Sequence, residues 1–284
     1  MILFKIDWAP NEVFLNLGPL TIYWYSVMFI IAFSLGYYIV QKIYINDTKP
    51  VALVEPLFIY VVFGTLLGAR LGEVFFYNWD YFQNNLVEIL LPIKNDSSSS
   101  MLFGLIDGYK FVGYRGLASH GATIGIITAM FIYKFKFKYD SVLWIFDRIV
   151  IPISIGGMFV RIGNFFNSEI VGNYTNSNFG VVFKNNGDIF PRHPAQLYEA
   201  FGYLLLFILL WNIYWKTDSK KYKGFIFGLF LTCLFSIRVL VEYVKESQGG
   251  FEEYLGILST GQWLSIPFIL IGITLMIYSR RRSF

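Results

Sequence analysis

The sequence "IVIPISIGGMFVRIGNFFNSEIVG", residues 149–172, joins a long apolar run to a dense group of polar side chains. A transmembrane helix needs about 20 mostly apolar residues, and the run that ends at residue 160 is long enough to form one. Arg161, Asn164, Asn167 and Glu169 follow it directly. Charged and hydrogen-bonding groups are costly beside the hydrocarbon layer of a bilayer, so this accumulation calls for partners.

The composition of the whole chain indicates a membrane protein. Of its 284 residues, 56% are hydrophobic, 20% are aromatic and only 15% are charged. A soluble domain has about 25% charged residues. One cysteine, Cys233, excludes an internal disulfide and a multi-cysteine metal site, and two histidines leave little for a histidine-based metal site. The first residues lack the pattern of a cleaved signal peptide, so we expect none. We therefore predict an all-α, polytopic membrane protein.

Seven apolar segments predict seven transmembrane helices. They cover about residues 21–41, 56–77, 117–134, 142–160, 195–215, 224–243 and 263–279. Lys and Arg gather after the first, third, fifth and seventh segments, whereas the other connections are longer and mixed in charge. Because Lys and Arg accumulate on the cytoplasmic side, the N-terminus is predicted outside and the C-terminus in the cytoplasm. The chain is expected to be one transmembrane domain, 1–284, with larger extracytoplasmic loops at about 78–116 and 161–194.

Polar residues are expected to converge at the outer level of this topology. Each of the first six segments contributes polar residues: Tyr25, Arg70, His120, Arg161, Asn164, Asn167, Glu169, the stretch "RHPAQLYE" (192–199) that leads into the fifth segment, Arg238 and Glu242. Each has a simpler explanation by itself. Tyr25 could belong to an aromatic belt at the interface, and His120 could be a histidine at a helix contact. Arg238 and Glu242, four residues apart on one helix face, could form a structural ion pair.

Other polar or small residues in the segments are assigned to structure. Asp147 and Arg148, nearer the inner side, are expected to be a structural pair. Gly64, Gly68 and Gly72 form two overlapping small-xxx-small steps, which predict close helix packing and no chemistry.

Three arginines at one membrane depth indicate an anionic ligand. Buried cations need anionic partners, and Glu169 and Glu242 meet only part of that demand. Arginine forms bidentate hydrogen bonds to phosphate, and the abundant phosphate of a membrane surface is a phospholipid headgroup. We therefore predict a lipid-headgroup site, with His120 as the candidate for proton transfer because its ordinary pKa lies near neutrality.

The segment "GGMFVRIGNFFNSEIVG" resembles the signature of the bacterial phosphatidylglycerol–prolipoprotein diacylglyceryl transferases. The resemblance covers nearly the whole chain and includes "YWYSVMF" (23–29), "GARLGEVFFYN" (68–78), "RHPAQLYE" (192–199) and "RVLVEY" (238–243). Val160 replaces a glycine of the signature. Ala122 stands where the family typically has the second glycine of a His-Gly-Gly motif, and we expect it to alter the local loop geometry.

The resemblance implies a reaction and its participants. The diacylglyceryl group of phosphatidylglycerol passes to the lipobox cysteine thiol of a prolipoprotein, a thioether forms, and glycerol 1-phosphate leaves. It implies the multi-pass cytoplasmic (inner) membrane of a bacterium, and neither a metal, a cofactor nor a nucleic-acid partner. The implied catalytic residues are His120, Arg238 and Tyr25, with His120 as the base. The implied substrate-binding residues are Arg161, Asn164, Glu169, Glu242, Arg70 and Gly172, with Gly172 serving as a backbone requirement.

Other functional classes remain as alternatives. An anion or lipid transporter would line a path through the whole membrane depth with polar residues, and Asp147 and Arg148 are the main candidates for that. An intramembrane protease is disfavoured, because the chain lacks Gly-x-Ser-x-Gly, His-Glu-x-x-His and paired aspartates in the segments. A purely structural lipid-binding protein would bind phosphatidylglycerol without releasing glycerol phosphate.

Overall fold

The computed structural model describes residues 5–17, 20–91, 93–101, 106–111, 118–139, 141–246 and 258–281. The chain divides into two compact units, and each is described by itself. The first contains residues 1–48 and 143–284, and the second contains residues 49–142.

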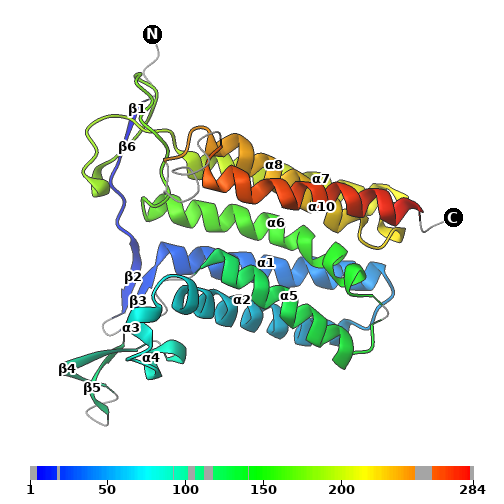
Figure 1. The fold of residues 1–284 in the computed structure, drawn as a ribbon, viewed down its shortest axis with the longest axis horizontal. Coiled ribbons are helices and arrows are strands. Elements are labelled where there is room, and N and C mark those ends of the chain that lie inside the picture. Colours follow the sequence, from blue (N-terminus) through cyan, green and yellow to red (C-terminus); the bar gives the residue numbers. More distant parts are fainter. Residues whose placement is uncertain are drawn as a thin grey trace. The chain divides into compact units, whose positions relative to one another are not determined.

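The first unit is built from five long helices that run side by side (Figure 1). They are α1 (Trp24–Asn46), α6 (Val142–Phe166), α7 (Ala195–Lys216), α8 (Phe225–Glu242) and α10 (Thr260–Arg281). Their shared core includes Ile43, Ile151, Leu210 and Ile226, all fully buried. Bulky apolar side chains on every helix explain why these segments associate in one bundle.

Short strands lie at one end of this bundle. Strand β1 (Lys5–Trp8) pairs in parallel with β6 (Gly180–Phe183), in a register that puts Lys5 opposite Gly180. Strands β2 (Val13–Leu17) and β3 (Leu20–Tyr23) form an antiparallel hairpin that leads directly into α1. Two 3₁₀ turns, η2 (Lys184–Asn186) and η3 (Asp218–Lys221), complete the described elements of this unit.

The second unit is organised around one close helix pair. It contains η1 (Val51–Leu53), α2 (Val54–Phe76), α3 (Trp79–Phe82), α4 (Val87–Leu90), β4 (Ile93–Met101), β5 (Ile106–Phe111) and α5 (Ser119–Lys136). Gly64 of α2 faces Gly125, and Gly72 faces Gly121, so the two helices are antiparallel. A Cβ added at Gly72 would lie 2.7 Å from the Cα of Gly121. The predicted close packing at these glycines is confirmed.

Among the residues that the structure describes, six helices are long and apolar enough to cross a membrane. They are α1, α2 together with η1, α6, α7, α8 and α10. The predicted segment 117–134 does form a helix, α5, but its 18 residues start beside His120 and include Lys134 and Lys136. The polytopic, mainly helical class is confirmed, and seven spans and their orientation stay predictions.

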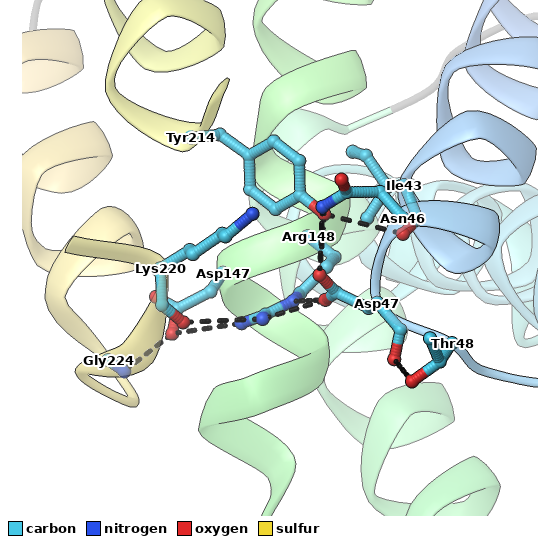
Figure 2. Close-up of polar contacts among 9 residues, drawn as sticks. All are labelled: Ile43, Asn46, Asp47, Thr48, Asp147, Arg148, Tyr214, Lys220 and Gly224. Carbon is cyan, nitrogen blue, oxygen red and sulfur yellow. Dashed lines mark hydrogen bonds and ion pairs between the residues drawn. The ribbon is translucent and has the colours of Figure 1, made fainter. Parts of the chain in front are cut away.

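Asp147 and Arg148 have a structural role, at the end of the first unit shown in Figure 2. The carboxylate of Asp147 accepts from the N–H of Gly224 at 2.7 Å, at the start of α8. It also accepts from the N–H of Phe227 at 2.8 Å. It therefore satisfies backbone donors that a helix leaves unbonded at its N-terminus, and opposes the positive end of the helix dipole. Asp147 is fully buried, so these bonds replace its lost hydration.

Arg148 ties three further segments together. Its Nε and Nη2 each lie 2.8 Å from Oδ2 of Asp47, at the end of α1, and Nη2 also donates to the carbonyl of Lys220. The hydroxyl of Tyr214 in α7 donates to the other oxygen of Asp47 at 2.7 Å. The ends of α1 and α7 and the start of α8 are thus fixed by neighbouring residues of α6, which confirms the structural reading.

Candidate functional site

The centre of the candidate site is Arg161, which lies on α6. The helix continues through Phe166, beyond the predicted end at residue 160, so Arg161 and Asn164 are helical rather than part of a loop that begins at 161. The Nε of Arg161 lies 2.6 Å from Oε2 of Glu199 in α7, and its Nη1 donates to Oδ1 of Asn164 at 3.3 Å. Tyr203, one turn after Glu199, is also hydrogen-bonded to Arg161. The guanidinium is therefore held from two helices.

A strained turn follows α6 and carries Glu169 back toward this arginine. Ser168 and Ile170 have φ values of 55° and 56°, in the left-handed region. This conformation is a true outlier for a β-branched residue such as Ile170 and is found mainly at functional sites. The turn lets Glu169 accept from Nδ2 of Asn164 and from Nδ2 of Asn167, both at 3.1 Å. Asn167 thereby gains a role that the sequence did not assign.

Tyr25, at the start of α1, completes this cluster. It is hydrogen-bonded to Asn164, and Arg161 and Glu169 lie within electrostatic range of its hydroxyl. Gly163 makes room for it, because an added Cβ would lie 2.6 Å from Cδ2 of the tyrosine ring. Gly163 is thus required for packing, and Tyr25 belongs to the network rather than only to an interfacial aromatic belt.

Arg238 of α8 lies within electrostatic range of Tyr203. The charges of Arg161, Glu199 and Arg238 all act on the Tyr203 hydroxyl. The Nε of Arg238 is buried and, within the described part of the chain, has no hydrogen-bond partner. Two arginines therefore act on one buried tyrosine, and two cations near one site are suited to binding an anion.

Glu242 pairs with Lys245 and not with Arg238, the structural alternative that its spacing had left open. Glu242 lies 3.6 Å from Nζ of Lys245, three residues further on, and its carboxylate packs against Gly261 of α10. Both partners are mostly buried, so Lys245 supplies the charge that Arg238 was expected to supply. Helix α8 ends at Glu242, so this pair spans the turn that follows the helix.

Gly172 is a backbone requirement. Its N–H donates to the carbonyl of His193 at 2.9 Å, and its carbonyl accepts from Nη1 of Arg192 at 3.2 Å. An added Cβ would lie 2.6 Å from both the His193 and Val244 carbonyl oxygens. No side chain fits there without moving the loop.

Arg192 fixes the loop that contains Gly172. Its Nε donates to both oxygens of Asp188 at 2.9 Å, its Nη1 lies 3.1 Å from Glu246, and its guanidinium covers the ring of Tyr174. Burial opposes the positive charge, but the hydrogen bonds to Asp188 and Glu246 outweigh it and raise the pKa of Arg192. The loop is therefore fixed by a persistent cation.

Arg70 belongs to the second unit, where it forms hydrogen bonds within that unit. Its Nε donates to the carbonyl of Ile89 (3.0 Å) and its Nη2 to that of Glu88 (2.5 Å), and the guanidinium covers the ring of Phe82. It was predicted as a substrate contact, but its described bonds hold the segment after α2.

His120 is the second residue of α5 and its side chain is exposed. Ala122 follows within the helix, and its N–H donates to the carbonyl of Ala118 at 3.0 Å. The expectation that Ala122 alters a loop is wrong, because a helical position does not require glycine. The residue that must be small at this helix contact is Gly121, because it packs directly against α2.

Three residues of α7 join the cluster without having been predicted as site residues, although Gln196 and Glu199 lie in the stretch 192–199 that was expected at this level. Glu199 and Tyr203 bind Arg161, and the fully buried Gln196 donates to the carbonyl of Glu169. Their signal was available, because an acid inside an apolar segment needs a partner and Glu199 stands in a predicted span. Its pairing could not be read from sequence, since it depends on how α6 and α7 are rotated.

Comparison with known proteins identifies relatives over the full length. The model of the family "Prolipoprotein diacylglyceryl transferase" matches residues 12–278. The phosphatidylglycerol–prolipoprotein diacylglyceryl transferase of Tolumonas auensis is 38% identical over 276 residues, 97% of this chain and 98% of that protein. The protein of the same name from Bacteroides fragilis is 41% identical over 285 residues, 99% and 98% of the two chains. That of Chloroherpeton thalassium is 38% identical over 278 residues, 98% and 96%.

Proposed function

The chain belongs to the prolipoprotein diacylglyceryl transferase family, and from this premise we propose how its polar cluster takes part in the reaction. The protein is a multi-pass membrane transferase that moves the diacylglyceryl group of phosphatidylglycerol to prolipoproteins. The acceptor is the lipobox cysteine thiol beside the signal peptide of the prolipoprotein. The single observation that supports this most is the match over nearly the whole chain, at up to 41% identity.

The membrane arrangement is part of the proposal. Helix α5 serves as a seventh span, because its antiparallel packing against α2 is as close as glycine allows. The N-terminus lies outside and the C-terminus, with Arg280 and Arg281, lies in the cytoplasm of a bacterial inner membrane. The cluster around Arg161 then opens toward the outer leaflet.

Arg161 and Arg238 bind the phosphate of phosphatidylglycerol. Arg161 is oriented by Glu199 at 2.6 Å and by Asn164, so its guanidinium is in place before the lipid arrives. Arg238 brings a buried Nε that needs an acceptor. Positive groups fixed in advance stabilise the charge that builds up on a leaving phosphate more than flexible ones do.

The chemical step is a displacement at carbon. The cysteine sulfur forms a bond to the carbon of the diacylglyceryl group that carries the phosphate. The bond from that carbon to the phosphate oxygen breaks. The electron pair leaves with glycerol 1-phosphate. The thiol proton passes to His120, since the thiolate is the stronger nucleophile. Tyr25, Asn164, Glu169 and Glu242 orient the arginines or the glycerol. Arg70 and Gly172 maintain the structure.

The transporter alternative is less well supported. This alternative needs Asp147 and Arg148 to extend the polar path through the membrane. Instead, Asp147 accepts hydrogen bonds at the start of α8 and Arg148 pairs with Asp47. Both residues are almost completely buried.

One incubation tests the proposed function. The purified full-length protein in phosphatidylglycerol vesicles is given a lipobox peptide, and mass spectrometry follows the peptide and the release of glycerol phosphate. We expect the peptide to gain one diacylglyceryl group, and a peptide with serine in place of cysteine to remain unmodified. Binding of lipid without any modified peptide would contradict the reaction.

The His120→Gln variant tests the base. We expect its turnover to fall about 10²-fold or more, as is typical of a lost general base. Near-normal turnover would refute the role of His120 and leave the phosphate site standing.

A further inference from the structure

The segment 79–91, directly after α2, has a structure suited to the surface of a membrane. We propose that α3 and α4 lie in the membrane–water interface at the end of α2, in contact with phospholipid. Arg70 holds them there through its hydrogen bonds to the carbonyls at the end of α4. The proposal concerns contact with phospholipid and is independent of the transfer reaction.

The first argument is depth. Helix α2 is one of the candidate spans and ends at Phe76. Arg70 lies six residues earlier, about 9 Å along the helix axis at 1.5 Å per residue. Its guanidinium nevertheless donates to the carbonyls of Glu88 and Ile89. Helix α4 therefore packs close to the last turns of the span, and Figure 1 shows α3 and α4 at this end of α2.

The second argument is that the polar groups of this segment are satisfied internally. A four-residue helix leaves its last carbonyls unbonded, and Arg70 takes two of them. The side chain of Glu88 is 3% exposed and accepts from the Tyr81 hydroxyl (2.8 Å) and from the Asn95 N–H (2.7 Å). Backbone and acidic groups with such partners can leave water without a large cost.

The third argument is the outward face. Leu86 is 64% exposed and Leu90 is 56% exposed, and Val87 and Leu91 are exposed beside them. Exposed Tyr77, Trp79 and Tyr81 lie just before them in the chain. Apolar side chains flanked by tyrosine and tryptophan are the composition of a membrane–water boundary. In water, such a patch would be costly.

Spin labels measure this placement. Cys233, the single cysteine of the sequence, is replaced in a Cys233→Ala background, and single labels are placed by Leu86→Cys and Leu90→Cys. Phe63→Cys on α2, an exposed position within a candidate span, gives the value for lipid. Ser97→Cys, exposed on strand β4, gives the value for water. Collision rates with oxygen and with a water-soluble nickel complex are compared for the full chain in phosphatidylglycerol–phosphatidylethanolamine vesicles.

We expect the ratio of the oxygen to the nickel collision rate at positions 86 and 90 to be several-fold higher than at position 97. It should approach the ratio at position 63. In an Arg70→Met background the nickel collision rate at 86 should rise, because α4 loses its cap. A ratio at 86 and 90 equal to that at 97 would overturn the proposal. Low collision rates with both reagents would also overturn it, since protein rather than lipid would then cover the face.

Discussion

The Nε of Arg161 lies 2.6 Å from Oε2 of Glu199, so an arginine of α6 is held by an acid placed in the apolar span α7. The Glu199 side chain is 3% exposed and that of Arg161 is 16% exposed. A pair so little exposed is expensive to break, because the remaining charge loses its partner without regaining water.

Glu199→Gln should therefore impair the enzyme while keeping the shape of the side chain. We expect at least a tenfold loss of turnover, because Arg161 is no longer oriented, and a loss of about 3 kcal/mol in stability. Turnover of the lipobox peptide and thermal unfolding measure the two effects. Asp218→Asn, in the exposed pair with Lys221, is the control and should change neither. Turnover within twofold of normal would contradict the role of Glu199.

Gly163→Ala should disturb Tyr25. The added methyl would lie 2.6 Å from the tyrosine ring, so the ring must move away from Asn164. We expect about 1–3 kcal/mol of destabilisation and a clear loss of turnover. Gly36→Ala is a matched control on α1, because its methyl would meet the nearest atom, Cβ of Pro152, at an ordinary 3.6 Å. Equal behaviour of the two variants would show that the Tyr25 ring does not need this space.

Arg148→Met should lower stability and leave the reaction of the folded fraction intact. It leaves Asp47 buried without its cation and removes the bond to Lys220, which costs about 3–5 kcal/mol. The melting temperature and the turnover per folded molecule test this. Lys221→Met, which breaks only an exposed pair, serves as the comparison. A folded variant with normal stability but no turnover would instead assign chemistry to this cluster.

Ala122→Gly tests the departure from the family motif. Ala122 is in the helical part of α5, so glycine should cost about 1 kcal/mol of stability and leave turnover unchanged. A gain in turnover would mean that the missing glycine does restrict the site.

The sequence predicted which residues gather more reliably than how they bond to one another. Arg161, Asn164, Glu169 and Tyr25 are brought together as expected, because an apolar helix that ends in polar residues concentrates them at one depth. Helix rotation and turn geometry decide the pairings, and neither can be read from spacing alone. Hence the pairing of Glu199 with Arg161 was not predicted, and Glu242 bonds Lys245 rather than Arg238.

The fold was predictable wherever hydropathy decides it. Six of the seven predicted spans correspond to described helices of sufficient apolar length, and the glycine steps of α2 indicated close packing. Helix boundaries were less certain: α6 runs to Phe166 because its last turns are polar but still helical. The role of Arg70 could not be predicted, because its partner is a backbone carbonyl and every residue has one.

The parallel pairing of β1 with β6 also sets an order of events during synthesis. Lys5 is opposite Gly180, which is 175 residues later in the chain. At roughly 5–20 residues per second, the first strand waits about 10–35 s for its partner to leave the ribosome. Strand β1 is therefore made well before the strand with which it pairs. Any delay in translation before residue 180 prolongs the time during which that strand is open to wrong partners.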